Sequence, residues 1–192
     1  MQREIREYFF MRITCVFSAL LAASTVMAEP LKLELADPQP SDLKQGLAVK
    51  YAQASVRTLS EAAQHLDDAT PGQPLAGLDY RDTAEGDATL TSGKATKVVA
   101  GISGFVRFEE AGTYVMDFLS NDGLQMTIGG QEVVYLDGVH PCEASEEVEV
   151  SVPEAGWYAL EGLYFQRKGS ACLHMRAGIG EADWMPNEAF GY

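Results

Sequence analysis

The stretch from Gly112 to Gly130 constrains the fold of this chain more than any other part of the sequence. Apolar side chains alternate with other residues over positions 114–118 and again over positions 124–128. Such a period of two is typical of β-strands that bury one face. Between the two segments, Ser120-Asn121-Asp122-Gly123 ends in a glycine that tolerates positive φ, which predicts a tight hairpin turn. We therefore expect consecutive strands on either side of this turn.

The same turn has two chemical interpretations. Asn121 and Asp122 place two oxygen-bearing side chains next to each other, and a hard cation such as Ca²⁺ takes oxygen ligands of this kind. The same two residues also favour tight turns through their backbone preferences alone. The residue pattern leaves both interpretations open, and it makes Asn121 and Asp122 the candidate metal ligands.

The residue pattern of most of the remaining chain also predicts short strands, which are separated by residues that favour turns. Residues 157–166 are apolar on both faces, which predicts a central strand, and residues 58–66 favour one short helix. Regular turns between short strands predict an all-β fold, an antiparallel β-sandwich. The further predicted strands cover residues 46–52, 78–80, 97–108, 131–136, 148–152 and 171–175.

The N-terminus has the pattern of an export signal. Residues 11–28 combine a basic residue, an apolar run over 13–23 and small residues before a predicted cleavage after Ala28. The apolar run is too short to cross a membrane, and residues 1–10 form an upstream extension. We expect an exported protein, periplasmic or secreted, with no membrane span in the mature chain. Its predicted parts are a lead-in arm (29–45), a sandwich (46–178) and a C-terminal tail (179–192).

Export changes the interpretation of the cysteines. Cys15 leaves with the signal peptide, so that Cys142 and Cys172 remain in an oxidising compartment. A disulfide is favoured over a catalytic thiol or a metal ligand. Zinc at His140-Pro141-Cys142 is disfavoured, because no second Cys or His follows at ligand spacing.

Charge and motifs exclude other classes of function. The full chain carries a net charge of −14 and has no basic patch interleaved with aromatic residues, which excludes nucleic acid as a partner. The three histidines are scattered, and no His-Glu-x-x-His or Gly-x-Ser-x-Gly motif occurs. We predict that the protein is not an enzyme.

Most of the mature chain resembles the protective-antigen-14 (PA14) domain, the module shared by toxin protective antigens, yeast adhesins and many glycosidases, and its second half does so most specifically. The resemblance spans roughly residues 46–178. The segments that carry it are 103–114, 120–130, 137–140 and 155–173.

The resemblance implies two antiparallel sheets and, in the lectin members, a Ca²⁺ site. In those members two adjacent aspartates, often joined by a cis peptide, bind Ca²⁺, which in turn ligates sugar hydroxyls. Asp122 matches the second aspartate, whereas Asn121 replaces the first, so one formal charge is lost and weaker binding is expected. The resemblance suggests Asp137, in the following loop, as a further ligand.

Two functions remain open at this stage. The first is a Ca²⁺-dependent carbohydrate-binding module whose ligand-binding residues are Asn121, Asp122, His140 and the exposed aromatic candidate Trp184. A hydrogen-bonding structural role is the other interpretation of His140. The second function is a structural or protein-interaction module of the cell envelope that binds neither metal nor sugar. The expected partner is thus a glycan or an envelope protein.

Overall fold

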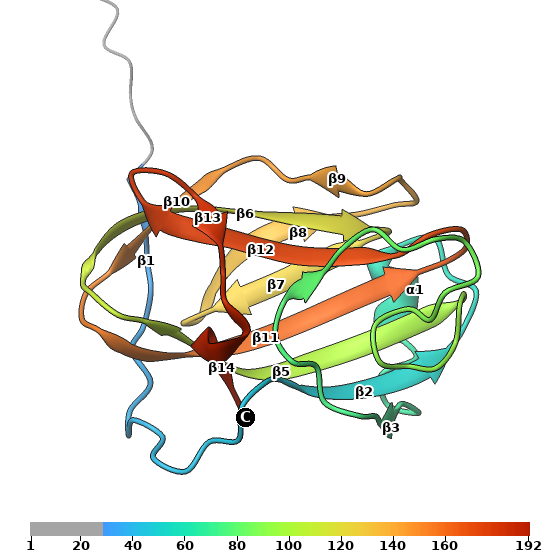
Figure 1. Cartoon of the computed structure of the whole chain (residues 1–192), viewed down its shortest axis with the longest axis horizontal. Coiled ribbons are helices and arrows are strands. Elements are labelled where there is room, and N and C mark those ends of the chain that lie inside the picture. The colour runs from blue at the N-terminus through green and yellow to red at the C-terminus, as the bar shows by residue number, and fades with distance from the viewer. Residues whose placement is uncertain (1–28) are drawn as a thin grey trace, which may run out of the picture.

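The two predicted sheets form, and they pack face to face as a β-sandwich (Figure 1). The structure is a computed structural model that describes residues 29–192, so the predicted signal peptide and upstream extension lie outside the described residues. All strand pairs are antiparallel except β1 with β10, which run parallel at one edge. The predicted all-β fold class is therefore confirmed.

We call the two layers sheet A and sheet B. Sheet A has the order β1-β10-β6-β12-β13, with β4 also pairing with β12 and β9 with β6. Its strands are β1 (Leu31–Lys32), β4 (Asp79–Tyr80), β6 (Gly112–Asn121), β9 (Glu143–Ala144), β10 (Val148–Val152), β12 (Cys172–Ile179) and β13 (Asp183–Trp184).

Sheet B has the order β3-β2-β5-β11-β7-β8, and β14 pairs with β5. The predicted central strand is confirmed, because β11 lies between β5 and β7. The strands of this sheet are β2 (Ala48–Gln53), β3 (Thr70–Pro71), β5 (Val98–Phe108), β7 (Leu124–Ile128), β8 (Gln131–Leu136), β11 (Gly156–Gln166) and β14 (Phe190–Gly191), the last preceded by the 3-10 helix η1 (Asn187–Ala189).

The core lies between the sheets and follows the alternation seen in the sequence. Met116 and Phe118 of β6 are fully buried and face Leu124 and Met126 of β7 within one hydrophobic cluster. Burial of such side chains is the main favourable term in folding, at about 1.5–3 kcal/mol for each. Tyr158 and Tyr164 are also fully buried in this core, whereas Phe165 is fully buried in a second cluster on the other face of sheet B. None of the three is available as an exposed sugar-stacking surface.

The one α-helix among residues 29–192, α1 (Leu59–Ala63), covers part of the outer face of sheet B. It begins where the sequence predicted, because Thr58 caps it by accepting a hydrogen bond from the Glu61 backbone N–H. The Glu61 carboxylate in return accepts from the Arg57 N–H at 2.7 Å. Within residues 29–192, no helix has the length and apolar character needed to cross a membrane.

The prediction of a hairpin at residues 120–123 is wrong. β6 pairs with β10 and β12 in sheet A, whereas β7 pairs with β8 and β11 in sheet B, so the turn carries the chain from one sheet to the other. Both strands direct alternate side chains into the same core, and a hairpin would give the same alternation. Gly129 and Gly130 do form a hairpin turn, with φ of 51° and 75°, between β7 and β8.

Candidate functional site

The Asn121-Asp122 turn is rigidly held at the end of β6. The peptide bond between the two residues is cis, as the PA14 resemblance implies. The Tyr164 hydroxyl donates to the Asn121 carbonyl, and the Ser120 hydroxyl donates to the Asp122 carbonyl at 2.7 Å. Gly123 is required next, because a Cβ there would lie 2.3 Å from the Phe165 ring. The turn therefore fixes the position of both candidate ligands.

The Asp122 carboxylate connects two loops that are distant in the sequence. Its Oδ1 accepts a hydrogen bond from the His140 backbone N–H at 3.1 Å, and its Oδ2 accepts from the Arg167 N–H at 2.7 Å. Asp122 is only 1% exposed, and burial raises the pKa of its carboxyl, although the two hydrogen bonds and the nearby His140 and Arg167 side chains oppose that change. Among the described residues, no lysine or arginine side chain forms an ion pair with it.

Asn121 leaves one of its polar atoms without a partner. Its amide nitrogen donates to the Ser170 hydroxyl at 3.4 Å, whereas its Oδ1 is buried and accepts no hydrogen bond within the described part of the chain. Buried acceptors are satisfied in the great majority of cases. An unpaired oxygen beside a buried carboxylate is the feature that a bound cation would satisfy.

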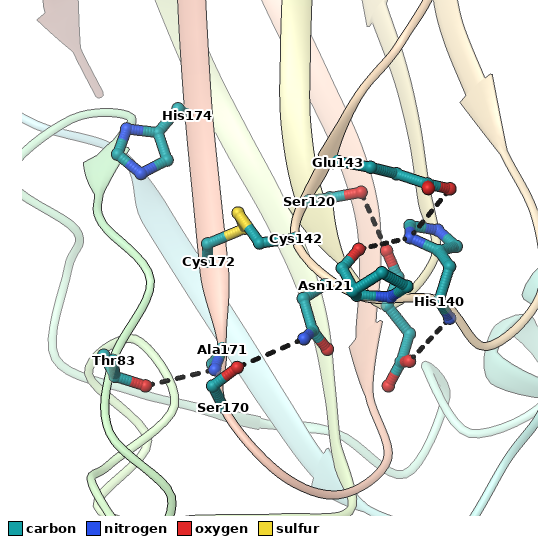
Figure 2. Close-up of a disulfide and its surroundings, with 12 residues drawn as sticks. Thr83, Ser120, Asn121, His140, Cys142, Glu143, Ser170, Ala171, Cys172 and His174 are labelled. Atoms are coloured by element: carbon teal, nitrogen blue, oxygen red, sulfur yellow. Dashed lines mark hydrogen bonds and ion pairs between the residues drawn. A yellow bond between two sulfur atoms is a disulfide. The ribbon is translucent and has the colours of Figure 1, made fainter.

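His140 lies at the turn, as the sequence suggested (Figure 2). Its ring Nδ1 is 2.9 Å from the Pro141 carbonyl oxygen and 3.4 Å from Glu143 Oε1. Its Nε2 is buried without a partner in residues 29–192. The backbone of His140 therefore positions Asp122, while its ring contacts the first residues that follow it.

The predicted disulfide forms between Cys142 and Cys172, with an S–S distance of 2.01 Å. Cys172 is the residue paired with Asn121 across β12 and β6, so the bridge lies directly beside the turn (Figure 2). It holds the loop that carries His140 against sheet A. The cysteines thus stabilise the site as well as the fold.

Two other predicted site residues, Asp137 and Trp184, make no hydrogen bond to Asn121 or Asp122 in the described structure. Asp137 nevertheless lies near the turn, because it directly follows Leu136, which pairs with Leu124. The Asp137 carboxylate accepts from the Leu59 N–H at 2.6 Å and from the Gly138 N–H at 2.8 Å, so it is engaged at the first turn of α1. Trp184 is 42% exposed and lies opposite Arg176 of β12. Arg176 is four residues from Cys172, the residue beside the turn, and this spacing corresponds to about 13 Å along a strand. Its role in ligand binding stays a prediction.

The sequence interpretation missed the loop between β11 and β12. Arg167 and Ser170 of this loop contact Asp122 and Asn121, respectively. The turn signal Arg-Lys-Gly-Ser marked the loop itself, but only the pairing of β12 with β6 brings it to the site.

The side chains at the turn fit a calcium ion. Ca²⁺ binds carboxylate, amide and hydroxyl oxygens, and Asp122, Asn121 and Ser170 offer one of each. Among residues 29–192, no group of three or more His, Cys, Asp or Glu side chains is placed to hold a metal ion. Of the three side chains at the turn, only Asp122 would contribute a formal negative charge. The set therefore fits Ca²⁺, with fewer charges than a turn of two aspartates.

A separate hollow of about 740 Å³ lies on the outer face of sheet B beside α1. Its floor includes Gly101 and Gly162, and Lys50 and Glu161 are its only charged lining residues. Four of its lining side chains carry oxygens, namely Ser103, Gln125, Thr127 and Glu161, but none of these oxygens is both buried and without a hydrogen-bond partner. At the turn, by contrast, Asn121 Oδ1 is one of two buried side-chain oxygens in residues 29–192 that accept no hydrogen bond, the other being Gln166 Oε1.

Comparison with solved structures shows the same fold in PA14 and adhesin domains. The PA14 domain of the antifreeze protein MpAFP has a TM-score of 0.63 at 17% identity, and the alignment covers 81% of this chain and 95% of that one. A PA14 sugar-binding domain from an RTX adhesin gives 0.59 at 16% identity, with 77% and 98% covered. The epithelial adhesin 9 A domain from Candida glabrata, solved with Galβ1-3GlcNAc, gives 0.59 at 13% identity, with 85% and 95% covered.

At the level of sequence, a search of curated proteins returned no match. The family model described as the PA14 domain matches residues 66–188, which is more than half of the chain and includes the Asn121-Asp122 turn, the disulfide and the loop between β11 and β12. This chain therefore belongs to the PA14 domain family.

Proposed function

We propose that this protein is an exported, non-catalytic module that binds a carbohydrate at the Asn121-Asp122 turn with the help of Ca²⁺. The observation that carries the proposal is the buried, unpaired Oδ1 of Asn121 next to the carboxylate of Asp122, which has no cationic partner among the described residues. PA14 domains of similar fold include a sugar-binding adhesin domain and an adhesin in complex with a disaccharide.

Each residue of the turn has a separate part in this proposal. Asp122 supplies the negative charge and connects the His140 loop to the Arg167 loop. Asn121 supplies a neutral oxygen, and the disulfide beside it holds one of the two loops in place. When bound, Ca²⁺ would supply coordination positions for sugar hydroxyls.

Export is supported by the oxidised cysteine pair. Disulfides persist in the periplasm and outside the cell, and they are rare in reducing compartments. An exported module that carries no catalytic motif in its sequence acts by binding.

A second candidate is a structural module of the cell envelope, and one observation favours it. Both oxygens of Asp122 already accept backbone hydrogen bonds, so the carboxylate has a structural role even without an ion. In that case the turn would hold two loops together and bind neither metal nor sugar.

Thermal unfolding with and without Ca²⁺ separates the two candidates. A ligand at 100 times its Kd stabilises by about 2.7 kcal/mol, which raises the Tm of a domain of this size by about 5–11 °C. We expect this increase for the wild-type chain and for Asp42→Asn, an exposed control in the arm, but not for Asp122→Asn. A glycan array probed in Ca²⁺ and in chelator then identifies the sugar.

An unchanged Tm of the wild-type chain in millimolar Ca²⁺ would remove the calcium proposal and leave the structural role. Asp122→Asn is preferred to alanine, because the amide retains an oxygen for one of the two backbone hydrogen bonds.

A further inference from the structure

Trp184 of β13 is an exposed aromatic residue whose ring is held in place by its neighbours. The guanidinium carbons of Arg81 and Arg176 lie 5.7 and 5.3 Å from the centre of the ring. The centre of the His174 ring lies 5.1 Å away. Trp184 is nevertheless 42% exposed. An aromatic ring that is already positioned loses little conformational entropy when a ligand stacks on it, so Trp184 is suited to contact a ligand.

Two of these contacts come from β12, on the side of the indole that faces sheet A. Met175 of β12 is fully buried in the core, so its neighbours His174 and Arg176 point outward. Trp184 is paired with Arg176, and its ring contacts both outward side chains. The side chain of Arg81, the third neighbour, is 72% exposed. The indole therefore keeps exposed surface that a ligand can cover.

β12 connects Trp184 to the Asn121-Asp122 turn along the outer face of sheet A. Cys172, which is paired with Asn121, is two residues from His174, or about 7 Å along a strand. Both residues point outward, because side chains two positions apart lie on the same face. Trp184 is paired with Arg176, yet its ring reaches His174. The indole therefore leans along β12 toward the turn.

Residues 79–83 run beside β12 between Trp184 and the turn. At one end of this segment, Arg81 contacts the Trp184 ring. At the other end, the Thr83 hydroxyl accepts a hydrogen bond from the Ala171 N–H at 3.1 Å, in the loop that also contacts the turn (Figure 2). The segment carries carboxylate, guanidinium and hydroxyl groups, which are the donors and acceptors that pair with sugar hydroxyls. Polar groups therefore border the path from the turn to the indole.

We propose that the outer face of sheet A binds an oligosaccharide, with one sugar at the Asn121-Asp122 turn and a later sugar of the same chain stacked on Trp184. A sugar ring has a face of C–H groups that packs on an indole, while its hydroxyl groups remain free for the polar residues beside it. This proposal rests on the proposed function, because the sugar chain is anchored at the turn. It adds the class of ligand and the residue that selects for chain length.

Sugars of increasing length test the proposal. Mono-, di-, tri- and tetrasaccharides of gluco, galacto and manno configuration are titrated in Ca²⁺ into a Trp157→Phe variant. The sequence contains two tryptophans, so Trp184 is the only one left in this variant. We expect at least one series in which a tri- or tetrasaccharide binds about tenfold more tightly than the monosaccharide, as for an engaged interface tryptophan. The longer sugar should also change the Trp184 fluorescence, whereas the monosaccharide should not.

Variants assign the gain in affinity to the indole. Trp184→Ala should remove the gain with chain length and leave the affinity for the monosaccharide unchanged. Trp184→Phe should retain part of the gain, and it remains informative if the alanine variant loosens β13. The control is Ile179→Ala, which removes a 51% exposed apolar side chain at the far end of β12 and should change neither affinity.

The outcomes separate this proposal from the function on which it rests. Equal affinity for short and long sugars, abolished by Asp122→Asn, would overturn the extended surface and leave carbohydrate binding at the turn intact. A gain with chain length that survives Trp184→Ala would likewise overturn the assignment to the indole. If no sugar of any length binds at millimolar concentration, the proposed function and this inference both fail.

Discussion

Replacing Asn121 with aspartate gives the sharpest test of a cation at the turn. The two side chains have nearly the same shape, so the substitution changes charge with little change in packing. Without a cation the two carboxylates would repel each other, and at a separation of about 5 Å and an effective dielectric constant of about 20 the repulsion is about 3 kcal/mol. In chelator, we therefore expect the Tm of Asn121→Asp to fall by about 6–12 °C relative to the wild-type chain.

Calcium should reverse the sign of this effect. If a bound ion cancels the repulsion, Ca²⁺ binding to Asn121→Asp becomes more favourable by up to the same amount, about 3 kcal/mol. This corresponds to a Ca²⁺ affinity up to about 100-fold higher than that of the wild-type chain. Calorimetric titration measures the affinity directly, and thermal melts over a series of Ca²⁺ concentrations provide an independent measurement. The variant would then be the less stable protein in chelator and the more strongly stabilised one in Ca²⁺.

The control is Asp79→Asn, which changes one partly exposed carboxylate of sheet A away from the turn. It should leave the Ca²⁺ response unchanged. Equal Ca²⁺ responses of Asn121→Asp and the wild-type chain would refute the reasoning, because a second carboxylate in a real coordination site must change the affinity.

Three further predictions concern the surroundings of the turn. Replacing Cys142 and Cys172 by serine should lower the free energy of unfolding by about 3.5–4 kcal/mol, the value of the chain-entropy model for a sequence separation of 30. Denaturant unfolding measures this loss, and a loss below about 1 kcal/mol would contradict the prediction. Burial raises the pKa of Asp122, so a proton competes with Ca²⁺ for its carboxylate at a higher pH than it would at an exposed aspartate. The increase in Tm caused by Ca²⁺ should therefore shrink as the pH falls from about 7 toward about 4, and a constant increase would argue against Asp122 as a ligand. Burial lowers the pKa of His174 in spite of the nearby Asp79, so the folded state favours the neutral imidazole and loses stability as the pH falls below about 6.5; His174→Gln should flatten this part of a Tm-against-pH curve.

The sequence by itself determined the strands and their inward faces. Period-two alternation identified β6, β7 and β10, and turn residues separated them, because side-chain burial on one face is a local property of a strand. The cysteine count, together with the export signal, also predicted the Cys142–Cys172 disulfide. In the same way, the adjacent oxygens of Asn121 and Asp122 marked the candidate site before any fold was known.

Only the tertiary structure decided which segments meet at that site. Strand pairing uses backbone hydrogen bonds that are the same for every sequence, so alternation gives the face of a strand but not its neighbour. For this reason the turn was expected to be a hairpin and proved to be a crossing between sheets. The pairing of β12 with β6 brings Arg167 and Ser170 to the turn, and the position of α1 gives Asp137 Oδ1 a hydrogen bond from the Leu59 N–H.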